Sequence, residues 1–189
     1  IKNPQNSEEL IISQVGWELY KKFYEGYTLK HWKCHPRELA PSVCGRLPIR
    51  TNRDDRYLSE SFQALPKDGY TTMFDRLLEA AGQNVTLQLN TSFEDARQSI
   101  SFRHLIYTGP IDAYFERSLG ALPYRSLRFE FESFSPDQLE EREREHGKAG
   151  FWQPFLQVNY PNDHDFTRIV EIKHATGQRC GYTTIVREY

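Results

Sequence analysis

The spacing of apolar residues divides the chain into an N-terminal part with a helical period and a C-terminal part with a period of two. From Ser7 to Tyr24, apolar side chains recur at steps of three and four residues, which predicts a helix with one apolar face. Ser7 is the expected N-cap, because its hydroxyl can accept a hydrogen bond from the first turn. Gly16 is expected to mark a kink or a break, and Gly26 is expected to end the helix.

Two further helices are expected before the period changes. One follows Pro36, since proline is favoured in the first turn of a helix. The other covers 70–81, where apolar residues share one face and Gly82 provides the stop. Between them, 45–56 is expected to be a loop that carries several arginines.

Alternating apolar and polar residues then predict a series of strands. These strands are the segments 85–89, 101–108, 124–134, 155–160, 166–173 and 183–189. Short connections between them favour an antiparallel arrangement. Two segments interrupt the series: 111–119 is expected to be a short helix, and the charge-rich 136–150 is expected to be a solvated helix or an insertion between strands.

Helices followed by strands predict an α+β fold, in which N-terminal helices precede a twisted antiparallel β-sheet. From these patterns we divide the chain into a helical part at 1–56, a connecting helical segment at 57–84 and a sheet part at 85–189.

The composition argues against some classes of function. The formal net charge of −2 is unlike that of a general nucleic-acid-binding protein, which needs a basic surface to displace counterions. No apolar run approaches the roughly 18 residues of a membrane-spanning helix, so no membrane insertion is expected. Three cysteines, a small and odd number, are typical of a reduced, cytoplasmic setting. The chain starts without methionine, so an upstream part stays open.

The stretch 23–57 holds the strongest candidate chemistry. Aromatic side chains come first and guanidinium groups follow, in the order Phe23, Tyr24, Tyr27, Trp32, Arg46, Arg50, Arg53 and Arg56, with Tyr57 at the end. Rings can stack on a planar base, and arginine forks suit phosphate because their donors lie in one plane. The pattern is typical of a nucleoside diphosphate site, but a packed helix followed by a polar loop has the same pattern. On the residues alone, both interpretations stay open.

Arg168 is a second candidate, because it is a lone cation in a predicted apolar strand. Most arginines are exposed, so a surface residue is one interpretation. The sharper one is a second arginine that contacts the same phosphate as Arg46. The segment 107–112, a predicted strand with a Gly-Pro turn, is a further candidate, beside a plain connection between strand and helix.

Metal and dinucleotide motifs are not found. His31, Cys34 and His35 lie close together, but no partner cluster supplies the four converging ligands of a metal site, so no metal is expected. The glycine-rich turn that binds a dinucleotide pyrophosphate does not occur in the sequence.

Taken together, the motifs resemble the UDP-galactopyranose mutases, flavoenzymes of bacterial cell-surface sugar synthesis. The matching pieces follow the family's order and cover most of the chain: GYTLKHW (26–32), RLPIRTNRDDRY (46–57), FQALPKDGYTTMFDRLL (62–78), YTGPIDAYF (107–115), YRSLRFE (124–130), VNYP (158–161) and FTRIVEIKH (166–174). No single piece is specific, whereas the set is. The segment 136–150 matches no piece of the family.

The resemblance implies a three-part fold with a flavin-binding Rossmann domain, a helical domain with a mobile substrate loop, and an antiparallel sheet. This chain resembles the last two parts, so we expect a fragment of a three-domain flavoprotein. The implied reaction interconverts UDP-galactopyranose and UDP-galactofuranose, with N5 of reduced FAD forming a covalent sugar adduct. The implied substrate is UDP-galactose, and a homodimer of the full-length protein stays open. We expect the isolated chain to be inactive, because most of the FAD site would lie outside it.

The resemblance also implies roles for single residues. Arg46, on the mobile loop, and Arg168 would be the catalytic pair at the pyrophosphate. The implied substrate-binding residues are Phe23, Tyr24, Tyr27, Thr28, Trp32, Tyr57, Arg125, Asn159 and Glu188, with Tyr27 stacking on uracil. The implied cofactor-binding residues are Asn90, Thr91, Gly109 and Pro110. Lys33 and Cys34 replace the glycine that follows the tryptophan in the family, so the hinge of the loop is expected to differ.

Two other functions stay open. A flavin amine oxidase on the same scaffold would turn over an amine with oxygen, but it would not need the arginine loop. A non-enzymatic module would hold a nucleotide or an anionic glycan between the rings and the arginines.

Overall fold

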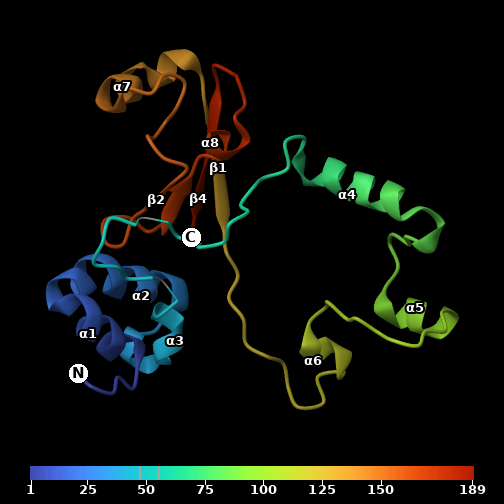
Figure 1. Ribbon diagram of the computed structural model, residues 1–189. Helices are drawn as coiled ribbons and strands as arrows, with labels where there is room; N and C mark the ends of the chain where they lie inside the picture. The colour runs from blue at the N-terminus through green and yellow to red at the C-terminus, as the bar shows by residue number, and fades with distance from the viewer. Residues whose placement is uncertain (47, 55) are drawn as a thin grey trace. The chain divides into compact units, whose positions relative to one another are not determined.

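The computed structural model, which describes residues 1–46, 48–54 and 56–189, contains helices and a four-stranded antiparallel sheet (Figure 1). The predicted α+β class is therefore confirmed. The chain divides into two compact units, one made of 1–65 with 125–189 and the other of 66–124. These bounds differ from the three predicted parts, because the sheet and the N-terminal helices belong to the same unit.

Four of the predicted strand segments form the sheet. They contain β1 (Phe129–Phe134), β2 (Gln157–Asn159), β3 (Arg168–Val170) and β4 (Thr183–Glu188), in the spatial order β1-β4-β3-β2. Arg168 lies opposite Asn159 on one side and opposite Glu188 on the other. Residues opposite one another in a ladder share a face of the sheet, so these three side chains lie on the same face.

The other face of the sheet carries the apolar core. Phe134, Ile169 and Ile185 are buried there, and α7 (Pro136–His146) adds Leu139, which is fully buried. A capping box starts this helix and a left-handed glycine ends it. The charge-rich segment is thus a solvated helix, as predicted, with one leucine that joins it to the sheet.

A buried carboxylate joins the sheet to the loop before β2. Glu171 is fully buried, and its oxygens accept hydrogen bonds from the backbone N–H groups of Trp152 (2.9 Å) and Gln153 (3.0 Å) and from the hydroxyl of Thr183 (2.5 Å). Lys173 is also buried, and its ammonium group donates to three backbone carbonyls of the surrounding loops. A charge buried in this way is tolerated only when such partners are present.

The first N-terminal helix has its N-cap one residue before the predicted one. The N-terminal helical elements are α1 (Ser7–Leu19), a π-helical stretch (Tyr20–Glu25), α2 (Gly26–Trp32), a 3₁₀ turn (Pro36–Glu38) and α3 (Pro41–Cys44). Ser7 is not the N-cap: the side chain of Asn6 accepts from the third helical residue, and the Ser7 hydroxyl donates to a carbonyl at 2.7 Å instead. The predicted kink at Gly16 is confirmed by its φ of 79°.

The prediction that Gly26 ends the helix is wrong. Its φ of −62° is helical, and the helix continues to Trp32. A β-carbon at Gly26 would lie 2.5 Å from the Pro161 carbonyl oxygen and 2.5 Å from Oδ1 of Asn162. This glycine therefore permits close packing of α2 against the segment after β2, rather than a turn.

The second unit contains α4 (Gly69–Ala81), α5 (Phe93–Ser99) and α6 (Ile111–Tyr114). The helix predicted at 70–81 and its stop at Gly82, whose φ is 56°, are confirmed. The strands predicted at 85–89 and 101–108 are wrong, because neither segment pairs with another strand in the described chain. Alternation alone makes no strand without a partner. No helix among the described residues has the length and apolarity to cross a bilayer.

Leu139→Ala is expected to lower the free energy of unfolding by about 2–5 kcal/mol, because a fully buried side chain leaves a cavity behind. Glu140→Ala, on the exposed side of the same helix, is the control and should change that free energy by less than about 0.5 kcal/mol. Urea unfolding followed by circular dichroism measures both variants. Equal small effects would contradict the packing of α7 on the sheet.

Candidate functional site

Arg168 is the centre of the strongest candidate site. Its Nε lies 3.2 Å from Oε1 of Glu188 on the neighbouring strand β4. One terminal nitrogen lies 3.3 Å from Nε2 of His31 in α2, and the other donates to Oε1 of Gln157 at 3.4 Å. Two strands and a helix therefore orient the guanidinium group.

Tyr27 and His31 present their rings to Arg168 from one side of α2. They are four residues apart, which makes them neighbours on a helix surface, and their ring centroids are 4.6 Å apart. The guanidinium carbon of Arg168 lies 6.0 Å from the centroid of the Tyr27 ring. Lys30 holds α2 against the sheet part, since its ammonium group donates to two backbone carbonyls at 2.6 and 3.2 Å.

Burial and the neighbouring cations keep His31 neutral. Burial is the largest cause that lowers its pKa, and Arg168, Arg46 and Lys33 lower it further, while Glu188 opposes them. A guanidinium group can only donate hydrogen bonds. Nε2 of His31 must therefore accept from Arg168, and Nδ1 carries the ring proton.

Burial also raises the pKa of Tyr27, and Glu188 and Tyr57 add to the rise, while Arg168 and Arg46 oppose it. The phenol therefore keeps its proton at neutral pH and can donate a hydrogen bond. The charge of Arg46 lowers the pKa of Tyr27 and also that of His31. The arginine loop therefore lies close enough to this site to act on it electrostatically.

Contacts within the loop hold Arg50 and Arg56. Arg50 donates to the backbone carbonyl of Arg56 at 2.6 Å, and Nε of Arg56 donates to Oδ1 of Asp54 at 2.8 Å. The described residues of 45–56 have no regular structure beyond a turn, which confirms the predicted loop, and residues 47 and 55 lie outside the described part. The charge of Arg46 acts on the site around Arg168, because it lowers the pKa of both Tyr27 and His31.

Two predicted substrate residues pack in the helical core instead of beside Arg168. Thr28 is 5% exposed, and its hydroxyl lies 3.6 Å from Sγ of Cys44. Tyr24 packs against the buried cluster that contains Cys44 and Tyr20. Phe23, in contrast, is 53% exposed.

Two residues of the site were missed in the sequence. Gln157 donates from Nε2 to Oδ1 of Asn159 at 3.1 Å and also contacts Arg168, so β2 contributes two side chains to this face. His31 is the other. The signal for each was spacing: Gln157 lies two residues before a predicted site residue in a strand, and His31 lies four residues after Tyr27 in a helix.

The second unit holds the four predicted cofactor residues. Thr91 and Gly109 line one cavity of about 500 Å³. A β-carbon at Gly109 would overlap the ring of Tyr107, so the glycine permits that ring to lie across the turn. Asn90 has a left-handed φ of 54°, and Pro110 occupies the N-cap of α6.

The profile of the UDP-galactopyranose mutase family matches residues 22–189, a range that includes every predicted site residue. The chain belongs to this family. Among curated relatives, a protein named "Probable UDP-galactopyranose mutase" from Klebsiella pneumoniae is 35% identical over 92% of this chain. A "dTDP-fucopyranose mutase" from Escherichia coli is 34% identical over 93% of it, and a "UDP-galactopyranose mutase" from Mycoplasma pneumoniae is 29% identical over 87%. The chain spans only 41%, 44% and 40% of these relatives.

One departure from the mutase motif is visible in the backbone. Lys33, which stands where the family motif has a glycine, adopts a left-handed conformation with φ 55°. Glycine adopts this conformation freely, whereas another residue loses roughly 1–2 kcal/mol there. The preceding carbonyl, that of Trp32, accepts from two nitrogens of Arg125 at 3.3 and 3.4 Å. Both predicted residues therefore take part in the turn that ends α2.

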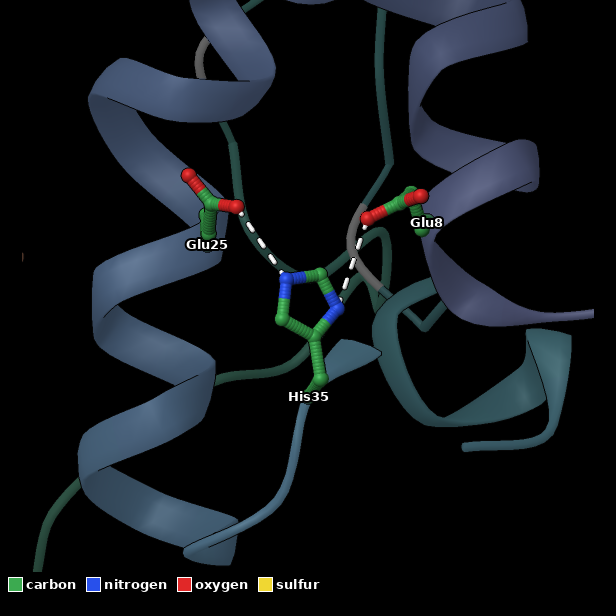
Figure 2. Close-up of side chains that lie close together, drawn as sticks. All are labelled: Glu8, Glu25 and His35. Atoms are coloured by element: carbon green, nitrogen blue, oxygen red, sulfur yellow. Dashed lines mark hydrogen bonds and ion pairs between the residues drawn. The ribbon is translucent and has the colours of Figure 1, made fainter. Parts of the chain in front are cut away.

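Figure 2 shows three ionisable side chains that converge between the N-terminal helices of this mutase-family chain, Glu8, Glu25 and His35. Nδ1 of His35 lies 3.4 Å from Glu8, and its Nε2 lies 3.2 Å from Glu25. Glu8 of α1 and Glu25 of the π-helical stretch therefore face opposite nitrogens of one ring, which connects these two segments.

The chain is expected to lose stability as the pH falls below about 6.5, the ordinary pKa of histidine. The pKa of His31 is lowered in the folded state, so the unfolded chain binds more protons in this range, until the pH falls through the folded pKa. His31→Gln keeps an acceptor for Arg168 and removes this titration. Its free energy of unfolding should therefore fall less than that of the unaltered chain as the pH is lowered.

Chemical denaturation at a series of pH values measures this difference. His104→Gln, which changes an exposed histidine of the second unit, is the matched control and should retain the full pH dependence. An unchanged pH dependence in His31→Gln would show that His31 is not held neutral in the folded chain.

Proposed function

We propose that this chain provides the nucleotide-sugar side of a flavin-dependent mutase that interconverts UDP-galactopyranose and UDP-galactofuranose for polysaccharide synthesis. The observation that carries the proposal is the position of the Arg168 guanidinium group 6.0 Å from the centroid of the Tyr27 ring, where the charge of Arg46 also lowers the pKa of Tyr27. Membership of the mutase family supports the same class of reaction.

Arg168 is suited to the pyrophosphate because it is oriented before any ligand arrives. Glu188, Gln157 and His31 each contact a different nitrogen of its guanidinium group. When UDP leaves the sugar, negative charge grows on the pyrophosphate, and a positive group fixed beside it stabilises that charge without reorganisation. The carboxylate of Glu188 balances the charge of Arg168 while no substrate is bound.

Arg46 would complete the pair from the loop. Tyr57 follows it along the chain, and the side chains of both affect the pKa of Tyr27, so the loop supplies a cation and a phenol to the same place. The Tyr27 ring would stack on uracil. Two further exposed rings belong to the same helical region, Phe23 in the π-helical stretch and Trp32 at the end of α2. His31 is neutral and Tyr27 is protonated, so neither cancels the positive charge offered to the pyrophosphate.

Residues of the second unit would contact the flavin. When bound, reduced FAD would supply the nucleophile for the anomeric carbon of the sugar. We assign Asn90, Thr91, Gly109 and Pro110 to its contacts, because Thr91 and Gly109 line the same cavity. The sequence has no glycine-rich pyrophosphate turn, so this chain by itself would hold only part of the cofactor. Its three unpaired cysteines support a cytoplasmic setting.

A thymidine nucleotide is the second candidate for the leaving group. The relative named "dTDP-fucopyranose mutase" is almost as similar to this chain as the one named "Probable UDP-galactopyranose mutase". UDP and dTDP differ by one ribose hydroxyl and one base methyl group. Titration with both nucleotides therefore distinguishes the two candidates.

Arg168→Ala and Arg46→Ala are each expected to weaken UDP binding about tenfold or more, since a charged hydrogen bond contributes roughly 1.5–3 kcal/mol. Arg168→Lys should restore only part of the affinity, because lysine lacks the planar fork. Arg144→Ala, which alters an exposed arginine of α7, is the control. Isothermal titration measures the affinities, and equal binding by the unaltered chain and both alanine variants would refute the pyrophosphate assignment.

Turnover is expected only from the full-length protein and only with reduced flavin. The measurement is conversion of UDP-galactofuranose to UDP-galactopyranose by chromatography, with and without dithionite. The isolated chain should show no turnover. A flavin absorbance band and activity in the 189-residue chain alone would overturn the expectation, and oxygen-dependent turnover of an amine would favour an amine oxidase.

A further inference from the structure

A second cavity lies on the face of the sheet opposite to Arg168. Its volume is about 520 Å³, within the range of small-molecule sites. Ile169 and Arg187 line it, and they lie opposite one another in the ladder between β3 and β4. Ile169 directly follows Arg168, and Arg187 directly precedes Glu188. Neighbouring residues of a strand point to opposite faces, so the sheet separates the cavity from the proposed mutase site.

Two guanidinium groups stand at the walls of this cavity. Arg142 of α7 stacks over the ring of Trp152, with 4.3 Å between the guanidinium carbon and the ring centroid, and donates to Glu145 at 3.0 Å. Arg187 lies 2.6 Å from a carboxylate oxygen of Glu132. A guanidinium group has five N–H donors, so each arginine keeps donors for an anion after its ion pair is made.

Two polar atoms at the cavity have no hydrogen-bond partner among the described residues. One is Oε1 of Gln153, a side chain that is 5% exposed and whose amide nitrogen is held by three backbone carbonyls. The other is Nε2 of His146. Nδ1 of His146 accepts from the backbone N–H of Lys148 at 3.2 Å, so Nε2 carries the proton of the neutral ring. The cavity therefore has an unpaired acceptor and an unpaired donor in its lining, where native structures usually satisfy both.

Aromatic side chains form the rest of the lining. Trp152, Tyr160 and Phe166 are partly buried and pack against the core of the sheet. Phe155 lies at the same cavity and is 65% exposed. Rings of this kind offer flat apolar contact to another planar ring.

We propose that this cavity binds a small aromatic anion, a planar ring that carries a phosphate or a carboxylate group. The aromatic side chains would contact the ring, and Arg142 and Arg187 would bind the anionic group. His146 and Gln153 would offer a donor and an acceptor to polar atoms of the ring. The site is independent of the proposed mutase chemistry, and it depends on α7, the segment that matches no motif of the family.

Isothermal titration of the full chain with matched probes tests this proposal. Phenyl phosphate and benzoate each combine a ring with an anion, and they distinguish a phosphate from a carboxylate ligand. At least one of them should bind with a Kd below about 1 mM. Inorganic phosphate and glucuronate lack an aromatic ring, and benzyl alcohol lacks an anionic group. Each of the three should bind at least tenfold more weakly. Equal binding of inorganic phosphate or glucuronate, or absence of binding by both aromatic anions, would overturn the proposal.

Variants of α7 locate the binding. Arg142→Gln should weaken binding of the aromatic anion at least tenfold. Arg144→Gln, on the same helix but outside the cavity, should leave that affinity unchanged. Arg168→Gln should also leave it unchanged, which separates this site from the proposed UDP site. If Arg142→Gln does not fold, Phe155→Ala replaces it, because that ring is exposed. Loss of affinity in Arg168→Gln, or none in the two cavity variants, would refute the site.

Discussion

The buried carboxylate of Glu171 is the constraint on which the sheet part depends. It joins the end of β3 to the loop before β2 and to the first residue of β4, through two backbone N–H groups and one hydroxyl. Removing one of these partners would leave a buried charge uncompensated, which is far more costly than losing an exposed contact. The same network joins β3 to β4 in the register that places Arg168 opposite Glu188, so an interaction remote from the candidate site supports its geometry.

The two faces of the sheet serve different purposes because neighbouring residues of a strand point in opposite directions. On one face, Arg168 meets α2 and forms the centre of the candidate site. On the other, Ile169 belongs to the core that α7 covers, beside the cavity with two unpaired polar atoms. A short strand thus separates two environments, one oriented by ion pairs and the other by apolar packing.

The period-two pattern predicted every strand of the sheet, but it also predicted strands at two segments that pair with no strand among the described residues. The segments around β3 and β4 were found because alternation and pairing coincide there, whereas 85–89 has the alternation without a partner strand. The ring and arginine stretch was visible, and the lone arginine in an apolar strand already suggested Arg168 as a partner of Arg46. The family resemblance then implied a role for each of them. The resemblance assigns Tyr24 and Thr28 to the substrate, and it does not show that both side chains also contact the helical core, because that packing depends on residues distant in the sequence.

The π-helical stretch, Tyr20–Glu25, lets the helix hold one extra residue before the site. A π-helical turn holds about one residue more than an α-helical turn, because its hydrogen bonds skip one further residue. Deleting a single residue from the stretch would therefore let it close as an α-helix, while the rings of Tyr27 and His31 keep nearly the same direction. Forcing the undeleted stretch into an α-helix would instead turn everything after it by roughly 100° about the helix axis, the rotation of one residue. In evolutionary terms, this stretch can absorb the gain or loss of one residue without abolishing this half of the site.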